Sequence, residues 1–136
     1  MAAPESRVRE RPLSPHLQVY RKQVQMMTSI THRITGVILA GGALAFVYGL
    51  AALAAGQTRW DGFTACLGGP LGRLLLLGVS WALAYHLVNG IRHLVQDTGH
   101  GFAIPDFVRS SWVSVIGSVL LTALGWGIVL MHWGQV

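Results

Sequence analysis

Two histidines stand in a polar part of a long apolar segment, AYHLVNGIRHLVQD, at residues 84–97. His86 and His93 are seven residues apart, so in a helix they lie nearly on one face and about 10 Å apart along the axis. Gly90, one turn after His86, leaves room on that face for a flat, bulky ligand. Because an ionisable side chain is costly inside a membrane, it is a candidate functional group there. The segment therefore predicts a metal or cofactor ligand at His86.

A haem is a ligand that the neighbouring basic groups would suit. Iron held by His86, with the propionates directed inward, would bring those acids beside His32, Arg33 and His93. We expect His32 and His93 near the inner interface, about 10 Å below His86. His132 falls close to the opposite surface, so a second axial histidine has to come from a partner chain. The alternative is a neutral His86 bonded to a serine or a backbone carbonyl of another helix.

The segment TSITHRITG, residues 28–36, forms a second candidate site where the chain enters the membrane. Ser29 and Arg33 are four residues apart and share a helical face, on which they offer a hydroxyl and a fixed cation. Such a pair suits the polar head of a ligand such as a quinone. The alternative is that a Ser or Thr caps the helix and Arg33 extends to the membrane surface.

Apolar segments must position these residues. Of the 136 residues, 52% are hydrophobic and only 11% charged, whereas soluble domains average about 25% charged. Three windows can each cross about 30 Å of hydrocarbon as a helix of about 20 residues. We expect transmembrane helices at about 30–56, 71–96 and 110–133 and a tail at 1–20. The predicted fold class is all-α, a single-domain integral membrane bundle of three transmembrane helices.

The distribution of basic residues predicts the orientation. The first loop carries two arginines and the C-terminal tail none, whereas six basic residues precede or begin the first span: Arg7, Arg9, Arg11, Arg21, Lys22 and Arg33. The N-terminus is therefore expected inside and the C-terminus outside. This asymmetry accounts for the formal charge of +5 through contact with anionic phospholipid, so no nucleic acid partner is expected.

The N-terminal tail has neither an apolar core nor an amphipathic repeat, so it does not look like a targeting peptide. We therefore favour the bacterial cytoplasmic membrane, with the mitochondrial inner membrane as the alternative. Gly41, Ala45 and Gly49 recur at four-residue spacing on the first span. Small residues in this pattern let helices approach closely in lipid, which suggests another chain beside the bundle.

Three motifs together resemble one family. RPLSPHLQVY at 11–20, SITHRITG at 29–36 and HLVNGIRHLVQD at 86–97, in this order and with three spans, are similar to the cytochrome b membrane-anchor subunit of succinate dehydrogenase, respiratory complex II. The resemblance covers about residues 11–133. It implies that the chain anchors catalytic subunits at the membrane and helps to pass electrons from succinate to ubiquinone.

The resemblance also implies roles for individual residues. His86 matches the axial ligand of haem b, and His32, Arg33 and His93 match groups near the propionates. The wall of the ubiquinone pocket matches Ser29, Ile30 and Arg33, and Asp97 matches an aspartate near the inner surface with a role in proton supply.

The implied partners are a flavoprotein subunit, an iron–sulfur subunit and a second small membrane anchor that supplies the other haem histidine. The sequence agrees independently, because it has a single cysteine, Cys66, and no dinucleotide fingerprint. FAD and iron–sulfur clusters must then belong to the partner subunits.

Three other functions compete with this interpretation. A haem-free structural anchor would lack the haem absorption of the complex. A small transporter would be expected to carry an acidic residue at mid-membrane, which the sequence lacks. A fumarate reductase anchor shares the architecture and reverses the direction of electron flow.

Overall fold

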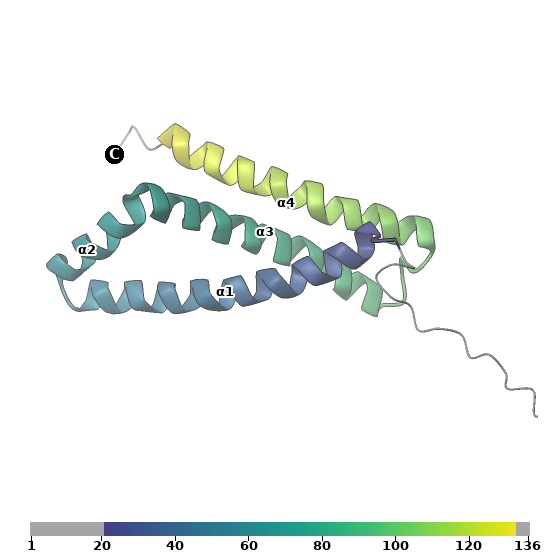
Figure 1. Cartoon of the computed structure of the whole chain (residues 1–136), viewed down its shortest axis with the longest axis horizontal. Helices are drawn as coiled ribbons and strands as arrows, with labels where there is room; N and C mark the ends of the chain where they lie inside the picture. The colour runs from purple at the N-terminus through teal and green to yellow at the C-terminus, as the bar shows by residue number, and fades with distance from the viewer. Residues whose placement is uncertain (1–20, 133–136) are drawn as a thin grey trace, which may run out of the picture.

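The computed structural model describes residues 21–132, most of which form four α-helices. They are α1 (Val24–Ala54), α2 (Gln57–Gly68), α3 (Pro70–Asp97) and α4 (Ile104–His132) (Figure 1). No strand occurs within residues 21–132, so the predicted all-α fold is confirmed. The tail predicted at 1–20 lies outside the described residues.

Three of the helices are long and apolar enough to cross a membrane. α1, α3 and α4 contain 31, 28 and 29 residues, which at about 1.5 Å per residue exceeds the roughly 30 Å of hydrocarbon. The three predicted spans are therefore confirmed. α1 and α4 begin earlier than predicted, at Val24 and Ile104 instead of at about 30 and 110.

The connection between the first two spans is a helix and not a simple loop. α2 begins after Gly56, whose φ of 109° lies in the left-handed region that favours glycine. It ends at a turn through Gly69, and α3 then starts with Pro70 in its first turn, a position that tolerates proline.

Close contacts hold α2 against both of its neighbours. A Cβ atom at Gly49 of α1 would lie 2.7 Å from Cε1 of Phe63, so the Phe63 ring packs directly on the α1 backbone. A Cβ atom at Gly72 of α3 would overlap the backbone of Cys66 and Leu67 at the end of α2. Glycine is thus required at position 72, whereas a larger residue at position 49 would force the Phe63 ring to shift.

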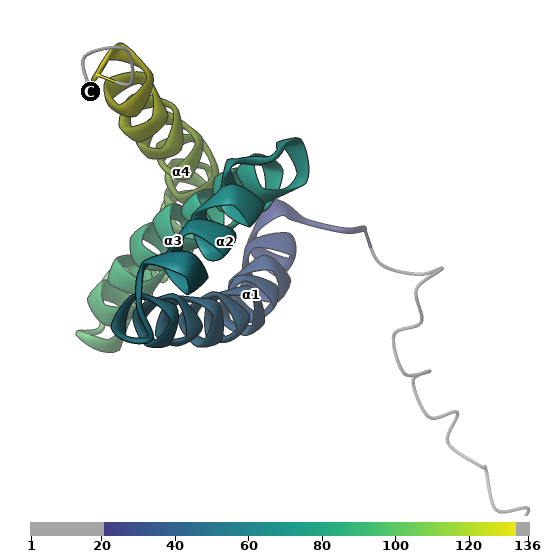
Figure 2. The same cartoon turned by 90° about the vertical axis from the view of Figure 1, so that its left-hand side faces the viewer.

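α3 is the central helix of the bundle. It contacts both α1 and α4, and α1 also contacts α4. Figure 1 shows α1 and α3 apart at the α2 end and close together toward the opposite end. Figure 2 shows α1 and α4 on different sides of α3, with α2 across one end. The opposite end holds the start of α1 and the connection at residues 98–103, and is called here the 98–103 end.

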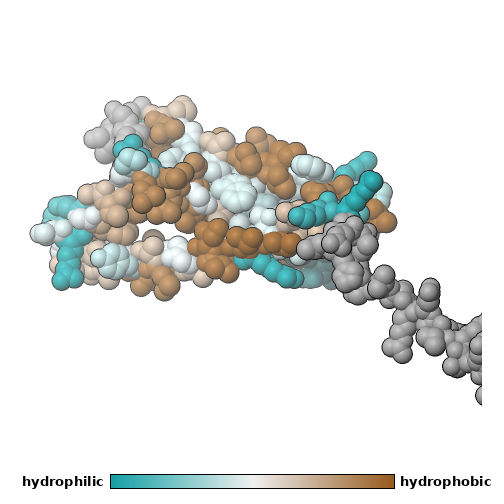
Figure 3. Space-filling view, viewed as in Figure 1, coloured by the Kyte–Doolittle hydropathy of each residue, from teal (hydrophilic) through white to brown (hydrophobic). Residues whose placement is uncertain are grey.

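The bundle is apolar outside and largely polar inside. Large hydrophobic side chains are exposed along all three long helices, and the visible face is brown along its middle and teal at its two ends (Figure 3). The buried positions include eight polar residues: Thr28, Thr35, Asn89, Arg92, Gln96, Ser111, Ser114 and Ser118. An apolar exterior and a polar interior suit lipid as the solvent. The chain is an integral membrane protein.

Substitution of Gly72 is expected to test the α2–α3 junction. Gly72→Ala places a methyl group against backbone atoms that cannot rotate away, so we expect a loss of about 1–3 kcal/mol of stability. Gly78→Ala, on the same helix with nothing within 4 Å of the added atom, is the control and should be neutral or stabilising. Thermal unfolding of the purified chain in detergent, followed by circular dichroism, measures the difference. Equal midpoints in the two variants would contradict the packing described.

Candidate functional site

Three histidines meet between α1 and α3. The imidazole rings of His32 and His86 stack, with centroids 3.9 Å apart and planes 10° apart. The ring of His93 lies 5.2 Å from that of His32 at an interplanar angle of 55°. The fold therefore brings the three predicted histidines into one group, called here the histidine cluster.

The depth predicted for His32 is wrong. His32 was expected about 10 Å below His86, but the two rings are stacked. Because α1 begins at Val24, His32 lies in the third turn of the helix and not at its start. The ring of His32 therefore lies beside that of His86 and not about two turns below it.

The ring of His86 is oriented by α1. Its Nδ1 atom lies 3.2 Å from the backbone oxygen of His32 and 3.3 Å from the Thr35 hydroxyl oxygen. The Thr35 hydroxyl donates to the same carbonyl at 2.9 Å. With its proton on Nδ1, His86 satisfies these contacts and keeps the Nε2 lone pair available, as metal-binding histidines commonly do. The backbone contact expected in the alternative interpretation is thus present, and it is compatible with ligation.

Glycines on both helices make room for the stacked rings. A Cβ atom at Gly36 would lie 3.2 Å from Cε1 of His86, and one at Gly90 would lie 3.9 Å from Cε1 of His32. The space that Gly90 was expected to leave for a flat ligand is therefore bordered by His32. Gly36 was missed as a site residue, although its place one turn after His32 was a visible signal.

The donors of the histidine cluster fit a haem. His86 offers one axial nitrogen, and the buried Nδ1 of His32 has no hydrogen-bond partner among residues 21–132. If that nitrogen carries the proton, it requires an acceptor such as a carboxylate. Across the same residues no group of three His, Cys, Asp or Glu side chains would hold a bare metal ion. A single histidine suffices where a macrocycle supplies the other metal ligands.

Ser29, Ile30 and Arg33 lie on the second and third turns of α1. Ser29 is half-buried, whereas Ile30 and Arg33 are exposed. α1 is preceded by Gln23, which makes no side-chain capping bond, so Ser29 does not cap the helix and that alternative is wrong. The explanation of Arg33 as a cation that extends to the membrane surface remains open.

Asp97 is the last residue of α3 and is exposed at the 98–103 end. A carboxylate is unfavourable at a helix C-terminus because of the helix dipole. Helix stability therefore does not explain this aspartate, and the role in proton supply expected for it stays a prediction.

Polar residues follow one buried face of α3, and most of them were missed. This polar strip consists of Tyr85, Asn89, Arg92 and Gln96, all buried. The Tyr85 hydroxyl donates to the backbone oxygen of Thr28 at 3.1 Å, directly before Ser29. Arg92 is only 8% exposed, although it stands near the end of the second span. The spacing of four, three and four residues between these polar positions was the available signal.

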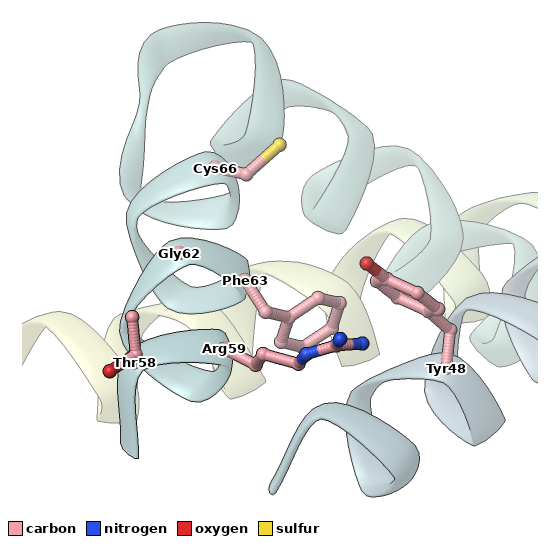
Figure 4. Close-up of a pocket in the computed structure, with 6 residues that line it drawn as sticks. All are labelled: Tyr48, Thr58, Arg59, Gly62, Phe63 and Cys66. Carbon is pink, nitrogen blue, oxygen red and sulfur yellow. The ribbon is translucent and has the colours of Figure 1, made fainter. Parts of the chain in front are cut away.

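A cavity of about 540 Å³ opens between α1 and α2, at the other end of the bundle. Tyr48 comes from α1, and α2 supplies the other lining residues, Thr58, Arg59, Gly62, Phe63 and Cys66 (Figure 4). Figure 4 shows the side chains of Tyr48 and Arg59 directed toward the same space. None of the predicted site residues lines this cavity, so it is separate from the histidine cluster.

Comparisons with known proteins agree on one family. The family model described as "Succinate dehydrogenase/Fumarate reductase transmembrane subunit" matches residues 7–125. The succinate dehydrogenase cytochrome b556 subunit of Paracoccus denitrificans is 41% identical over 114 residues, covering 84% of this chain and 88% of that protein. The subunit of the same name from Rickettsia conorii is 40% identical over 117 residues, covering 86% and 91%. The mitochondrial succinate dehydrogenase cytochrome b560 subunit of Sus scrofa is 40% identical over 114 residues, covering 81% and 66%.

Proposed function

Since the chain belongs to the succinate dehydrogenase/fumarate reductase transmembrane subunit family, we propose that it is the haem b-containing membrane anchor of a succinate:quinone oxidoreductase. It holds the catalytic subunits at the membrane and forms part of the site where ubiquinone is reduced. Its relatives include both bacterial and mitochondrial proteins. Of the two membranes, we propose the bacterial cytoplasmic membrane, with the N-terminus and the 98–103 end inside.

The haem proposal rests above all on His86, whose Nδ1 atom is fixed by the His32 carbonyl and whose Nε2 atom is available. His86 would bind the haem iron from this chain. His32, Arg33 and His93 bind the propionates, and the buried unpartnered Nδ1 of His32 supports this assignment. When bound, haem b supplies a one-electron redox centre.

The quinone proposal rests on the free polar groups of α1. Neither the Ser29 hydroxyl nor the exposed Arg33 guanidinium makes a side-chain hydrogen bond or ion pair within residues 21–132. The two groups bind the carbonyl oxygens of ubiquinone, and Ile30 packs against its ring. Hydrogen-bond donors at these oxygens become more effective as electrons arrive and negative charge develops there. Asp97 takes part in the supply of protons to the reduced quinone from the inner side.

The succinate chemistry belongs to partner subunits. A flavoprotein subunit carries FAD and oxidises succinate, and an iron–sulfur subunit delivers the electrons to the quinone site. The single cysteine of this chain, Cys66, cannot form a four-thiolate cluster. Phospholipid surrounds the apolar exterior, and no nucleic acid takes part.

A second small membrane anchor completes the haem site with its own histidine. The small residues Ser114 and Ser118 of α4 are buried inside the bundle. In contrast, Gly41 and Ala45 of α1 remain exposed within this chain. This exposed part of α1 is a surface on which a partner helix can approach closely.

Two alternative functions accompany the proposal that the chain is the haem-containing anchor of a succinate:quinone oxidoreductase. The family description also covers fumarate reductase, which would run the same electron path in reverse. The names of the relatives favour the succinate dehydrogenase direction. The other alternative is an anchor without haem.

Purification of the complex through an affinity tag on this chain tests the proposal. We expect four subunits, a low-spin b-type haem spectrum and succinate-dependent reduction of ubiquinone. A complex without haem absorption would support the haem-free anchor. A complex that reduces fumarate much faster than it oxidises succinate would support the fumarate reductase alternative.

A further inference from the structure

Arg92 carries a positive charge in the interior of the bundle. Its Nε donates to the Ser110 hydroxyl oxygen at 2.9 Å and its Nη1 to Oδ1 of Asn89 at 3.4 Å. The guanidinium carbon lies 4.4 Å from the centroid of the Phe107 ring. All of these partners are neutral, and Nη2 has no hydrogen-bond partner among the described residues. Within residues 21–132, no carboxylate pairs with this buried charge.

The hydrogen bonds of Arg92 do not explain why this residue is charged. Among its described partners only the Phe107 ring favours a cation, and that contact offsets just part of the cost of burying the charge. The hydrogen bonds to Ser110 and Asn89 require only N–H donors, which a neutral amide also supplies. Burial of an unpaired charge is unfavourable, and a neutral side chain would avoid that cost. A role that uses the charge itself accounts for its presence.

The proposed haem ligand is close enough to experience this charge. Arg92 follows His86 by six residues on α3, which places the two residues about 9 Å apart along the helix axis and about 120° apart around it. Because Arg92 is only 8% exposed, water screens it little. We take a separation of about 10 Å between the charge and the haem and an effective dielectric constant of about 20. One unit charge then changes the equilibrium constant for one-electron reduction of the haem by about tenfold.

We propose that Arg92 sets the redox equilibrium of the haem held by His86, and favours the reduced form through its charge without contacting the haem. Reduction adds one electron to the haem and makes its net charge more negative by one. A fixed cation nearby stabilises that product more than the oxidised form. The inference rests on the proposed haem site and adds a residue to it that acts at a distance.

An equilibrium redox titration of the haem in the assembled complex tests this role. At the potential where wild-type haem is half reduced, Arg92→Gln should lower the ratio of reduced to oxidised haem about tenfold. Arg92→Lys keeps the charge and should remain close to wild type. The low-spin spectrum should be unchanged in both, because the axial ligand His86 is intact.

A second pair of variants separates charge from packing. Ser110→Asp places a carboxylate against Arg92 and should lower the ratio in the same direction, whereas Ser110→Asn should not. This pair decides the question if Arg92→Gln does not assemble. The inference is overturned if the ratio of reduced to oxidised haem is unchanged in Arg92→Gln and Ser110→Asp. It is also overturned if Arg92→Lys lowers this ratio as much as Arg92→Gln does. A wild-type complex without haem overturns the proposed function as well, which distinguishes the two failures.

Discussion

Replacement of His86 by alanine is expected to abolish the normal low-spin haem b spectrum of the complex. The variant removes the only axial nitrogen that we assign to this chain, while the contact between Thr35 and the His32 carbonyl remains. Partial occupancy with an altered spectrum is compatible with the assignment, because a partner histidine and the propionate contacts can retain some haem. Optical and electron paramagnetic resonance spectra of the purified complex measure the change.

His132→Ala is the control for this variant. His132 is exposed at the end of α4, where its Nδ1 lies 2.9 Å from the backbone oxygen of Ile128. Its loss should leave the spectrum as in wild type. An unchanged low-spin spectrum in His86→Ala would refute the assignment of the axial ligand, whatever the result for His132.

Removal of either polar group from the quinone site is expected to lower quinone reduction about a hundredfold or more, as the loss of one preorganised transition-state hydrogen-bond donor typically does. The variants are Ser29→Ala and Arg33→Leu. Oxidation of succinate with a soluble electron acceptor should be nearly normal, because that reaction does not use this chain. Turnover per assembled complex, with the complex quantified by its flavin, separates catalysis from yield.

Matched controls replace the same residue types far from the site. Thr122→Ala removes a hydroxyl that donates to the Ser118 backbone oxygen within α4. Arg59→Leu removes an exposed arginine of α2, at the other end of the bundle. Both should reduce quinone at the wild-type rate. Normal turnover in both Ser29→Ala and Arg33→Leu would instead mean that Arg33 only extends to the membrane surface, and the quinone assignment would be wrong.

The three spans could be predicted because lipid imposes a simple requirement on sequence. A helix that faces hydrocarbon must be apolar for about 20 residues, and the sequence records this directly. The first residues of α1 and α4 were harder to predict from the sequence, since the first turns of these helices contain polar residues such as Gln25 and Asp106. The helix α2 was missed because Gln57, Arg59 and Asp61 interrupt its apolar residues.

The candidate site was predicted in its members but not in its geometry. Types and spacing identified His32, His86 and His93, yet the stacking of two of them depends on how α1 lies against α3. That register shows in contacts between the helices, such as the bond from Tyr85 to the Thr28 carbonyl, which hydropathy alone does not fix. The burial of Arg92 was equally hidden, because an arginine near a predicted span end is ordinarily taken as a surface residue.

The polar contacts of α3 have a consequence for how the protein matures. In lipid, apolar helix surfaces can slide past one another with little preference for any alignment. The bond from Tyr85 to the Thr28 carbonyl and that from Arg92 to Ser110 would both break if a helix shifted by one turn, about 5.4 Å. These two bonds therefore lock α1 and α4 to α3 without help from any other molecule. We expect the bundle to form first in the membrane, with His86 already aligned, and to receive its cofactor and its partner subunits afterwards.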